Sequence, residues 1–410
     1  MGGLFEKEAA ALAADLVALR RSLHTAPEVG LHLPGTQALV LDALAGTGLS
    51  VRTGENLSSV VAVLDGAGPG PTVVLRGDMD ALPVRERTGL PFAAEGEAMH
   101  ACGHDLHTAG LIGAVRLLAA RREEISGSVV FMFQPGEEGY DGAGLMLDEG
   151  LLDATPRPPD AAYALHVVAD LPAGRCYTRP GPIMASYGVL EVTVTGRGGH
   201  GGRPHEALDP IPVAAEAATA LQTYVTRRFD AFEPVVVTVG EFHAGTAPNV
   251  IPEHAVFRAG VRSFSDPVTE RLAAELPALV EGIAAAHGAR AEATFETVLP
   301  ATVNSPEHAA LFAETARALF GDDRFEELAR PRIGSEDFSR VLRRVPGAYG
   351  YLGAAPADAP GHPSGNHSPT AVFDDSVTPD AARLLAALAW QHVGPSPAPP
   401  STHRTGDTHD

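Results

Sequence analysis

The sequence predicts a large α/β domain with a central mixed, largely parallel sheet, interrupted by a smaller inserted α+β domain. Apolar, strand-like runs alternate with segments of helical periodicity in roughly the first 180 residues, a pattern typical of a parallel sheet covered by helices. A different set of strands and two long helices follows between residues 184 and 297. With 410 residues, the chain is long enough for two or three domains.

The first part of the large domain, residues 1–183, opens with an amphipathic helix. Leucines recur at helical spacing from Leu12 to Leu23, and Pro27 limits this helix. We expect strands over 59–64, 72–76, 128–133 and 161–166, and a helix over 108–122. Ligands bind at the carboxyl ends of strands in α/β sheets, so the polar segments that follow these strands should gather into one site.

The inserted domain is expected over residues 184–297, and the large domain resumes over residues 298–394. In the insertion we expect strands over 189–194, 235–239, 255–262 and 290–297, and helices over 210–227 and 267–287. The resumed domain should carry helices over 307–320 and 378–392. The tail, 395–410, is rich in Pro, Ser, Thr and His without apolar periodicity, which predicts disorder and makes His403 and His409 weak metal candidates.

Composition excludes several classes of function. A formal net charge of −21 argues against a nucleic-acid partner, because binding phosphates needs clustered Lys and Arg. The sequence has neither a run of about 18 apolar residues nor a basic segment followed by an apolar one at its start, so we expect a cytoplasmic protein with no membrane partner. Of the two cysteines, Cys102 and Cys176, the first lies between histidines, which favours a metal role over a disulfide.

The first chemical signal is the segment Arg-Gly-Asp-Met-Asp at 76–80, directly after an expected strand. Residues two apart on a strand share a face, so Asp78 and Asp80 should point together. A nearby cation or a histidine N–H would relieve their mutual repulsion. A solvated turn or a helix cap explains the isolated segment about equally well.

The second signal is His-Ala-Cys-Gly-His-Asp-Leu-His at 100–107. Thiolate and imidazole are the usual ligands of zinc-like ions, and Gly103 would allow the backbone to bring Cys102 and His104 onto one ion. Three histidines and a cysteine within eight residues are hard to explain by packing. Space filling or helix capping remains the alternative.

The third signal is Gln-Pro-Gly-Glu-Glu-Gly at 134–139, after another expected strand. Adjacent carboxylates diverge in a loop, so one can bind metal while the other acts as a general base. For an isolated pair, a solvated surface turn would be the better interpretation of Glu137 and Glu138. His166, at the end of a strand, and His367 are likewise more often structural, and they gain weight only because two metals would still need ligands.

In this order, the segments resemble the amidohydrolase branch of the di-zinc aminoacylase and carboxypeptidase superfamily, which includes hippurate hydrolases and auxin-conjugate hydrolases. The similarity runs from Arg-Arg-Ser-Leu-His-Thr-Ala-Pro-Glu at 20–28 to about residue 392. It implies that the large domain is catalytic and that the insertion is a lid or dimerisation domain, so a homodimer or a higher homo-oligomer is expected. It also implies two divalent metal ions, of zinc, manganese, cobalt or nickel.

The resemblance assigns roles to the motif residues. Cys102 would bridge the two metals, and the remaining ligands would be His104, Glu138, His166 and His367. Glu137 falls on the general base of the family. Asp80 resembles the carboxylate that orients a ligand, whereas Asp78 is expected only to support it.

In the insertion, the resemblance points to residues that handle substrate. His200 would stabilise the oxyanion, often in the active site of the partner subunit, although a histidine among glycines is by itself more typical of a loop. Asn249 and Arg262 match positions that hold the carboxylate end of the substrate, and a planar guanidinium suits a carboxylate. A surface salt bridge is the alternative for Arg262. The loop 334–338 should line the pocket, and His362 has no assigned role.

The expected function is hydrolysis of N-acyl amino acids, which are small hippurate-like or other acyl conjugates, to a carboxylic acid and a free amino acid. A dipeptidase or carboxypeptidase with the same di-metal site is the nearest rival. A metal-dependent binding or scaffold protein is favoured less, since Glu137, Glu138 and His367 are all present. A redox role for Cys102 and Cys176 is weakened by the absence of Cys-x-x-Cys spacing.

Overall fold

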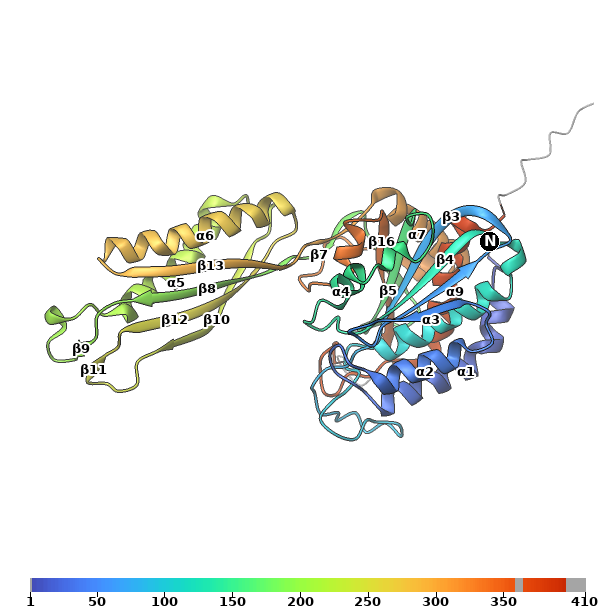
Figure 1. Ribbon diagram of the computed structural model, residues 1–410, viewed down its shortest axis with the longest axis horizontal. Helices are drawn as coiled ribbons and strands as arrows, with labels where there is room; N and C mark the ends of the chain where they lie inside the picture. Colours follow the sequence, from blue (N-terminus) through green and yellow to red (C-terminus); the bar gives the residue numbers. More distant parts are fainter. Residues whose placement is uncertain (1, 358–363, 396–410) are drawn as a thin grey trace, which may run out of the picture.

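The computed structural model describes residues 2–357 and 364–395, and its two large sheets follow one another along the long axis of the molecule (Figure 1). The eight-stranded sheet has the order β1-β2-β4-β3-β5-β16-β6-β15. Its strands are β1 (Ser50–Thr53), β2 (Val60–Asp65), β3 (Gly68–Asp78), β4 (Ser126–Gln134), β5 (Ala161–Pro172), β6 (Cys176–Thr178), β15 (Phe325–Glu327) and β16 (Gly347–Ala355). The central neighbours β4, β3, β5 and β16 run parallel to one another. Strand β2 is antiparallel to both of its neighbours, β1 and β4. The predicted mixed, largely parallel sheet is therefore confirmed.

Helices cover both faces of this sheet, because its strands are buried on both sides. One face carries α1 (Glu6–Thr25), α2 (Pro34–Leu44), α3 (His104–Ala119), α7 (Pro306–Phe320) and α9 (Thr378–Val393). The opposite face carries the short helices α4 (Gly142–Asp148) and α8 (Ser339–Leu342). Alternate residues of β3 supply the two cores: Val73 and Leu75 face the first group of helices, and Val74 faces the second.

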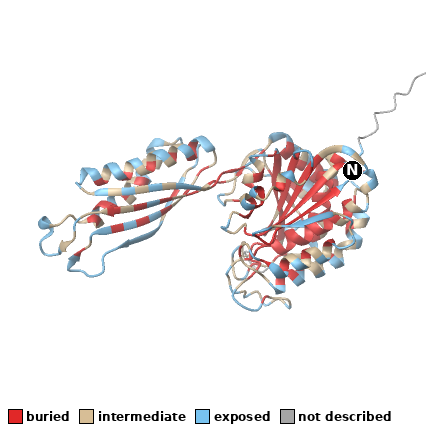
Figure 2. Ribbon diagram, in the orientation of Figure 1, coloured by how far each residue is buried: buried red, intermediate tan, exposed pale blue. Residues whose placement is uncertain are grey.

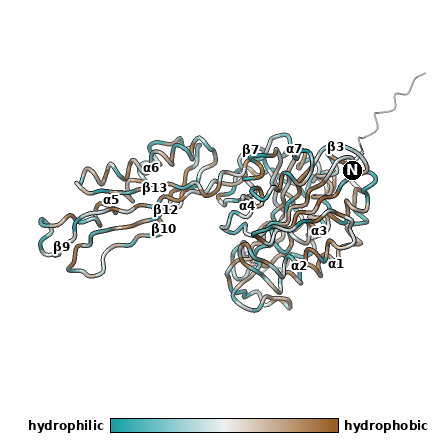
Figure 3. Tube along the Cα trace, viewed as in Figure 1, coloured by the Kyte–Doolittle hydropathy of each residue, from teal (hydrophilic) through white to brown (hydrophobic). Residues whose placement is uncertain are grey.

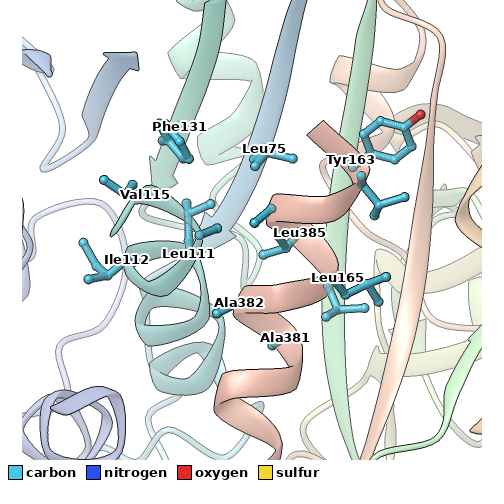
Figure 4. Packing of buried hydrophobic residues seen from close by; sticks show 14 of the residues in the cluster. Leu75, Leu111, Ile112, Val115, Phe131, Tyr163, Leu165, Ala381, Ala382 and Leu385 are labelled. Carbon is cyan, nitrogen blue, oxygen red and sulfur yellow. The ribbon is translucent and has the colours of Figure 1, made fainter. Parts of the chain in front are cut away.

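The larger core is built around α3 and α9, which pack against each other and against the central strands. Figure 4 shows Leu111 of α3 and Leu385 of α9 beside Leu75 of β3, with Leu165 of β5 on the other side of Leu385. Burial is concentrated in this domain (Figure 2), and hydrophobic segments run through its interior (Figure 3). The sheet is thus a rigid platform on which loops at its edge can be held.

The second sheet is antiparallel, with the order β10-β12-β8-β13. It comprises β8 (Tyr187–Thr195), β10 (Val236–Ala244), β12 (His254–Arg262) and β13 (Arg290–Leu299), with α5 (Pro210–Arg228) and α6 (Asp266–Ala286) on one face. In β12 the burial alternates from residue to residue, so the face opposite the helices is open. The strand pair of β9 (Gly199–His200) and β11 (Val250–Ile251) forms the tip farthest from the large domain (Figure 1).

Short elements complete the chain. The pair β7 (Gly181–Met184) and β14 (Thr302–Asn304) lies where the chain passes between the two sheets. Turns of 3₁₀ helix lie at Arg122–Glu124, Leu151–Asp153, Pro204–Glu206, Asp322–Arg324 and Asp375–Val377. None of the helices in the described ranges combines the length and apolar character needed to cross a bilayer. The tail predicted to be disordered lies, except for Pro395, outside the described residues, as do His362, His403 and His409.

Replacing Gly113 in α3 by alanine should destabilise the protein. The added Cβ would lie 2.5 Å from Cβ of Ala382 and 2.8 Å from Cδ1 of Leu16, where two other helices leave no room. Overpacking costs about 1–3 kcal/mol, which the better helix propensity of alanine, about 1 kcal/mol, offsets only in part. At Gly110 the same change meets Ala381 at 3.1 Å and should cost less. Denaturant midpoints of the two variants provide the comparison, and equal midpoints would contradict this packing argument.

Candidate metal centre

The polar segments that follow the central strands meet at one end of the large sheet. β3 ends at Asp78, β4 ends at Gln134, and α3 begins at His104, so residues 78–80, 100–107 and 134–139 lie together. His166 joins them from β5, where it pairs in register with Tyr351 of β16. This arrangement follows from parallel strands, whose carboxyl ends lie at a common edge.

Cys102 lies at the centre of the cluster. Its Sγ is 3.4 Å from Nε2 of His166 and 3.2 Å from Nε2 of His367. Oε1 of Glu138 lies 3.1 Å from the same nitrogen of His367 and 4.0 Å from Nε2 of His104. All five residues that the sequence nominated as ligands are therefore within reach of one another.

These five side chains form two groups of three potential ligands that share one member. Cys102, His104 and His166 form one group, and Cys102, Glu138 and His367 form the other, with all ligand atoms of a group within 4.8 Å of each other. A thiolate common to both groups is what a sulfur bridge between two ions requires.

The unsatisfied polar atoms of the cluster fit such ions. Both ring nitrogens of His104 are buried and form no hydrogen bond in the described part of the chain. Leaving such groups unpaired costs about 1–3 kcal/mol each, so a ligand is expected there. Thiolate, imidazole and carboxylate together suit a zinc-like divalent ion. The residues thus fit a pair of metal ions.

The electrostatics of the cluster favour a cation in the same place. Although burial opposes ionisation, hydrogen bonding to His367 and the charge of His104 lower the pKa of Glu138. Hydrogen bonds to Cys102 and Glu138 raise the pKa of His367 to about 10. The carboxylate and the thiol therefore draw positive charge to themselves, and a divalent ion would displace the protons.

Asp80 orients two parts of the cluster at once. Its carboxylate accepts hydrogen bonds from the backbone N–H groups of Glu137, at 3.1 Å, and Glu138, at 3.0 Å. The same carboxylate lies 3.4 Å from Nδ1 of His104. It thereby fixes the loop that follows β4 relative to the first residue of α3.

His107, one helical turn after His104, is a residue for which the sequence suggested no role. Its Nε2 accepts a hydrogen bond from the backbone N–H of Val167 at 2.7 Å, so its Nδ1 carries the proton and donates to Asp78 at 2.5 Å. The spacing of three residues on a helix could have indicated that His104 and His107 share a face. His107 joins Asp78 to the strand that carries His166.

The loop that carries His367 is anchored by its neighbour Asn366. The Asn366 side chain donates to the carbonyl oxygens of Val167 and Cys102, at 3.0 and 3.3 Å, and accepts from the backbone N–H of Ala169. His367 itself has a φ of 70°, a left-handed conformation that is uncommon for a residue with a side chain. The anchoring by Asn366 holds it in this conformation.

Gly103 meets a geometric requirement at the start of α3. Its φ is 80°, and a Cβ at this position would lie 2.4 Å from Cγ2 of Val167. Only glycine therefore allows the chain to turn between Cys102 and His104 while β5 passes directly beside it.

A second buried network supports the ligands from the side of α1. Asp105 lies 2.7 Å from Nε of Arg20 and 2.8 Å from Nδ1 of His24. His24 also contacts Glu86, and Arg20 donates to Asp375 at 2.8 Å. The segment at 20–28 thus acts through Asp105, the residue next to the ligand His104.

Arg76 is a fully buried cation that donates to Gln134, at the start of the loop that carries Glu137. Its guanidinium lies 2.5 Å from Asp78, 2.8 Å from Glu336 and 3.1 Å from Asp337. Three carboxylates around one cation leave excess negative charge, and burial together with Glu336 holds the pKa of Asp337 well above its usual range against the effect of Arg76. Tyr349 completes the network by donating to Glu336 at 2.6 Å.

Glu137 lies beside this acidic network and is partly buried. Its carboxylate has potential ligand atoms of Glu336 and Asp337 within 4.8 Å. Burial, followed by the charges of Glu336, Glu138 and Asp337, raises the pKa of Glu137 well above its ordinary value. A carboxyl group with a raised pKa suits general acid–base work. The sequence did not indicate Glu336 and Asp337 as the cause, since they lie about 200 residues away.

The residues nominated in the insertion do not lie at the cluster. His200 on β9 and Asn249 beside β11 are exposed at the distant tip of the second sheet (Figure 1). Arg262, at the end of β12, lies where the chain passes between the sheets and donates to the carbonyl of Ile333 at 2.9 Å. It therefore lies next to the loop 334–338 and forms no ion pair with any residue that the structure describes.

The two cysteines are separate and free. Cys176 lies on β6, and burial raises the pKa of its thiol to about 12. A thiol of this kind is unreactive near neutral pH. The geometry therefore gives no support to a redox role for the pair.

The sequence matches peptidase family M20/M25/M40 over residues 74–391. It is 36% identical to thermostable carboxypeptidase 1 of Saccharolobus solfataricus, covering 91% of this chain and 94% of the relative. It is 35% identical to N-acetylcysteine deacetylase of Bacillus subtilis, covering 91% of this chain and 96% of the relative.

Solved structures share the fold. A Bacillus subtilis protein described as a dinuclear metal binding peptidase from the M20 family superposes with a TM-score of 0.79 at 31% identity. The similarity covers 93% of this chain and 98% of that protein, so it includes both sheets.

Replacing Arg76 by methionine should lower the free energy of unfolding by about 3–5 kcal/mol, because it leaves buried carboxylates without their cation. Arg343→Met is the matched control, since it removes an exposed ion pair with Asp266 that is worth about 1 kcal/mol or less. Chemical denaturation of both variants gives the comparison. A loss for Arg76→Met no larger than that of the control would show that the buried network does not stabilise the fold.

Proposed function

The chain belongs to peptidase family M20/M25/M40 and is a hydrolase, and from this membership we propose that it is a metal-dependent amidohydrolase of N-acyl amino acids. It would release a carboxylic acid and a free amino acid. The observation that carries the proposal is the pair of ligand groups sharing Cys102, with Glu137 beside them as a carboxylate that belongs to neither. A pair of ions next to a free carboxylate is the arrangement that hydrolysis of an amide needs.

The metal ligands in this proposal are Cys102, His104, Glu138, His166 and His367. When bound, two divalent ions would polarise the amide carbonyl and lower the pKa of the attacking water. Zinc, manganese, cobalt and nickel all suit the donor set. A thiolate ligand requires a reducing compartment, which supports a cytoplasmic location.

Glu137 acts in this mechanism as the proton carrier. Its carboxylate takes a proton from the attacking water and later delivers it to the leaving amine. The raised pKa of Glu137 supports this role, because a more basic carboxylate is a better acceptor for the proton of the attacking water. Asp80 is a positioning residue, holding Glu137 and Glu138 through their backbone N–H groups.

His200, Asn249 and Arg262 complete the proposed site from the inserted domain. His200 donates a hydrogen bond to the oxyanion, and Asn249 and Arg262 bind the carboxylate end of the substrate. The exposed position of His200 at the far tip supports a homodimer or a higher homo-oligomer in which a second copy brings this histidine to the cluster. The inserted domain is accordingly a lid and dimerisation domain.

A peptidase is the second candidate function. The relative named thermostable carboxypeptidase 1 supports it, since it is as similar to this chain as the deacetylase is. The two candidates share the site and differ only in whether the acyl group is itself an amino acid or peptide. A panel of hippurate, N-acetyl amino acids, indole-acetyl conjugates and dipeptides separates them, using metal-free enzyme reloaded with one metal at a time.

Glu137→Gln should retain the fold and the metal content and lower kcat by about 10²–10⁴-fold on the best substrate of that panel, because the amide cannot accept the proton. Metal analysis and steady-state kinetics on the same preparation measure both quantities. Retention of the parent rate would refute the assignment of the base. Glu149→Gln is the control, since Glu149 is partly exposed and its carboxylate binds only residues 55 and 56, outside the metal cluster.

Cys102→Ala should reduce the bound metal below that of the parent, because the thiolate belongs to both ligand groups. Removing the thiolate should therefore weaken the binding of both ions. Elemental analysis after dialysis checks this, with Cys176→Ala as the control for loss of a buried thiol elsewhere. Unchanged stoichiometry in Cys102→Ala would argue against the sulfur bridge.

A further inference from the structure

Tyr351 has a buried hydroxyl group next to the metal cluster that the mechanism does not use. It lies on β16 opposite His166 of β5, so the two side chains share a face, and their ring centroids are 6.1 Å apart. The residue is 2% exposed, yet its hydroxyl has no hydrogen-bond partner among the described residues. Leaving a buried hydroxyl unpaired is costly, so such a group indicates a position where a ligand atom binds.

Arg332 lies over the ring of Tyr351. Its Cζ is 5.0 Å from the ring centroid, and its side chain is partly exposed. Unlike Arg340 and Arg343, which pair with Asp141 and Asp266, Arg332 forms no ion pair with any residue of 2–357 or 364–395. Its guanidinium is therefore free to meet an anion.

The backbone holds Arg332 in a fixed place. Its N–H donates to the carbonyl of Ile183 at 2.9 Å, and the carbonyl of Gly334 accepts from Ala185 at the same distance. Arg262 donates to the carbonyl of Ile333, the residue that follows Arg332. An arginine from each domain therefore lies beside Ile333, Arg262 through its guanidinium and Arg332 as its neighbour in the chain.

Several carboxylates lie close to the proposed metal ligands. Glu137, Glu336 and Asp337 form one cluster of carboxylates, and Glu138 lies beside them. An anionic substrate that approaches this cluster is repelled unless cations meet its charges. One guanidinium suffices for the α-carboxylate of an amino acid, because it can bind both oxygens. The second guanidinium matches a second anionic group.

We propose that Arg332 and Tyr351 form a subsite for a second carboxylate on the amino-acid part of the substrate. The preferred substrates are then acyl conjugates of dicarboxylic amino acids of the aspartate and glutamate type. This inference rests on the proposed function and on Arg262 as the clamp of the α-carboxylate. It adds a substrate class to the proposed function. The residues that would recognise this class belong neither to the loop 334–338 nor to the metal ligands.

Pairs of substrates that differ only in charge test the subsite. We compare N-acetylglutamate with N-acetylglutamine, and N-acetylaspartate with N-acetylasparagine, as kcat/KM of the metal-loaded enzyme. Loss of hydrogen bonds to a charged group corresponds to about 10- to 100-fold, so the parent should prefer the acidic member by that factor. Arg332→Met should remove most of this preference. Tyr351→Phe should lower the ratio of kcat/KM between the acidic and the neutral substrate by about tenfold or less.

Arg330→Met is the matched control, because Arg330 is exposed two residues away and has no role in the site. It should leave the ratio between acidic and neutral substrates at the parent value. Equal rates of the parent on both members of each pair, or an equal loss on both in Arg332→Met, would overturn the subsite and leave the amidohydrolase assignment intact.

Calorimetric binding separates the two hypotheses if neither member of a pair is hydrolysed, an outcome that would count against the proposed function. N-acetylglutamate should then still bind more tightly than N-acetylglutamine, and Arg332→Met should abolish the difference. Equal affinity of the parent for the two compounds would overturn the subsite independently of any turnover.

Discussion

Several buried carboxylates lie together at the carboxyl end of the large sheet, and the structure must supply positive charge to balance them. Asp78, Asp80, Glu336 and Asp337 are all buried there, and isolated buried charges are too costly to tolerate. Arg76 compensates Asp78, Glu336 and Asp337, and the thiol, imidazole and carboxyl groups of the neighbouring cluster fit divalent ions. The positions of the loops follow from this requirement, because each loop brings either a charge or the group that pairs with it.

Much of the site could be predicted because its signals are local. Cys102 and His104 lie within one short motif, Glu137 and Glu138 follow a buried strand, and glycine at position 103 marks the turn that joins two ligands. Single residues such as His166 and His367 could be proposed as metal ligands only because two ions require more ligands than the short motifs supply. The part of the site that lies within short sequence motifs was thus predictable.

The remainder depends on contacts between distant segments. Arg76 and Glu336 are 260 residues apart, and no local pattern connects them. β16 (Gly347–Ala355) was not predicted because its Gly and Ala residues have low strand propensity, although it lies buried beside β5. For the same reason Tyr351, which it carries, had no predicted role. The helix predicted over 108–122 begins at His104 instead, because Gly103 places the first turn directly in the metal cluster.

The arginines near the site differ in burial, and this difference distinguishes a structural arginine from arginines that can contact substrate. Arg76 is 1% exposed and surrounded by carboxylates of the protein, so no substrate can reach it. Arg332 and Arg262 are partly exposed, lie at the junction of the two domains and have no carboxylate partner in the described chain, so their charge is directed outward. An acidic protein with a formal net charge of −21 repels anions at long range. Selection among anionic substrates must therefore come from short-range contacts with such guanidinium groups.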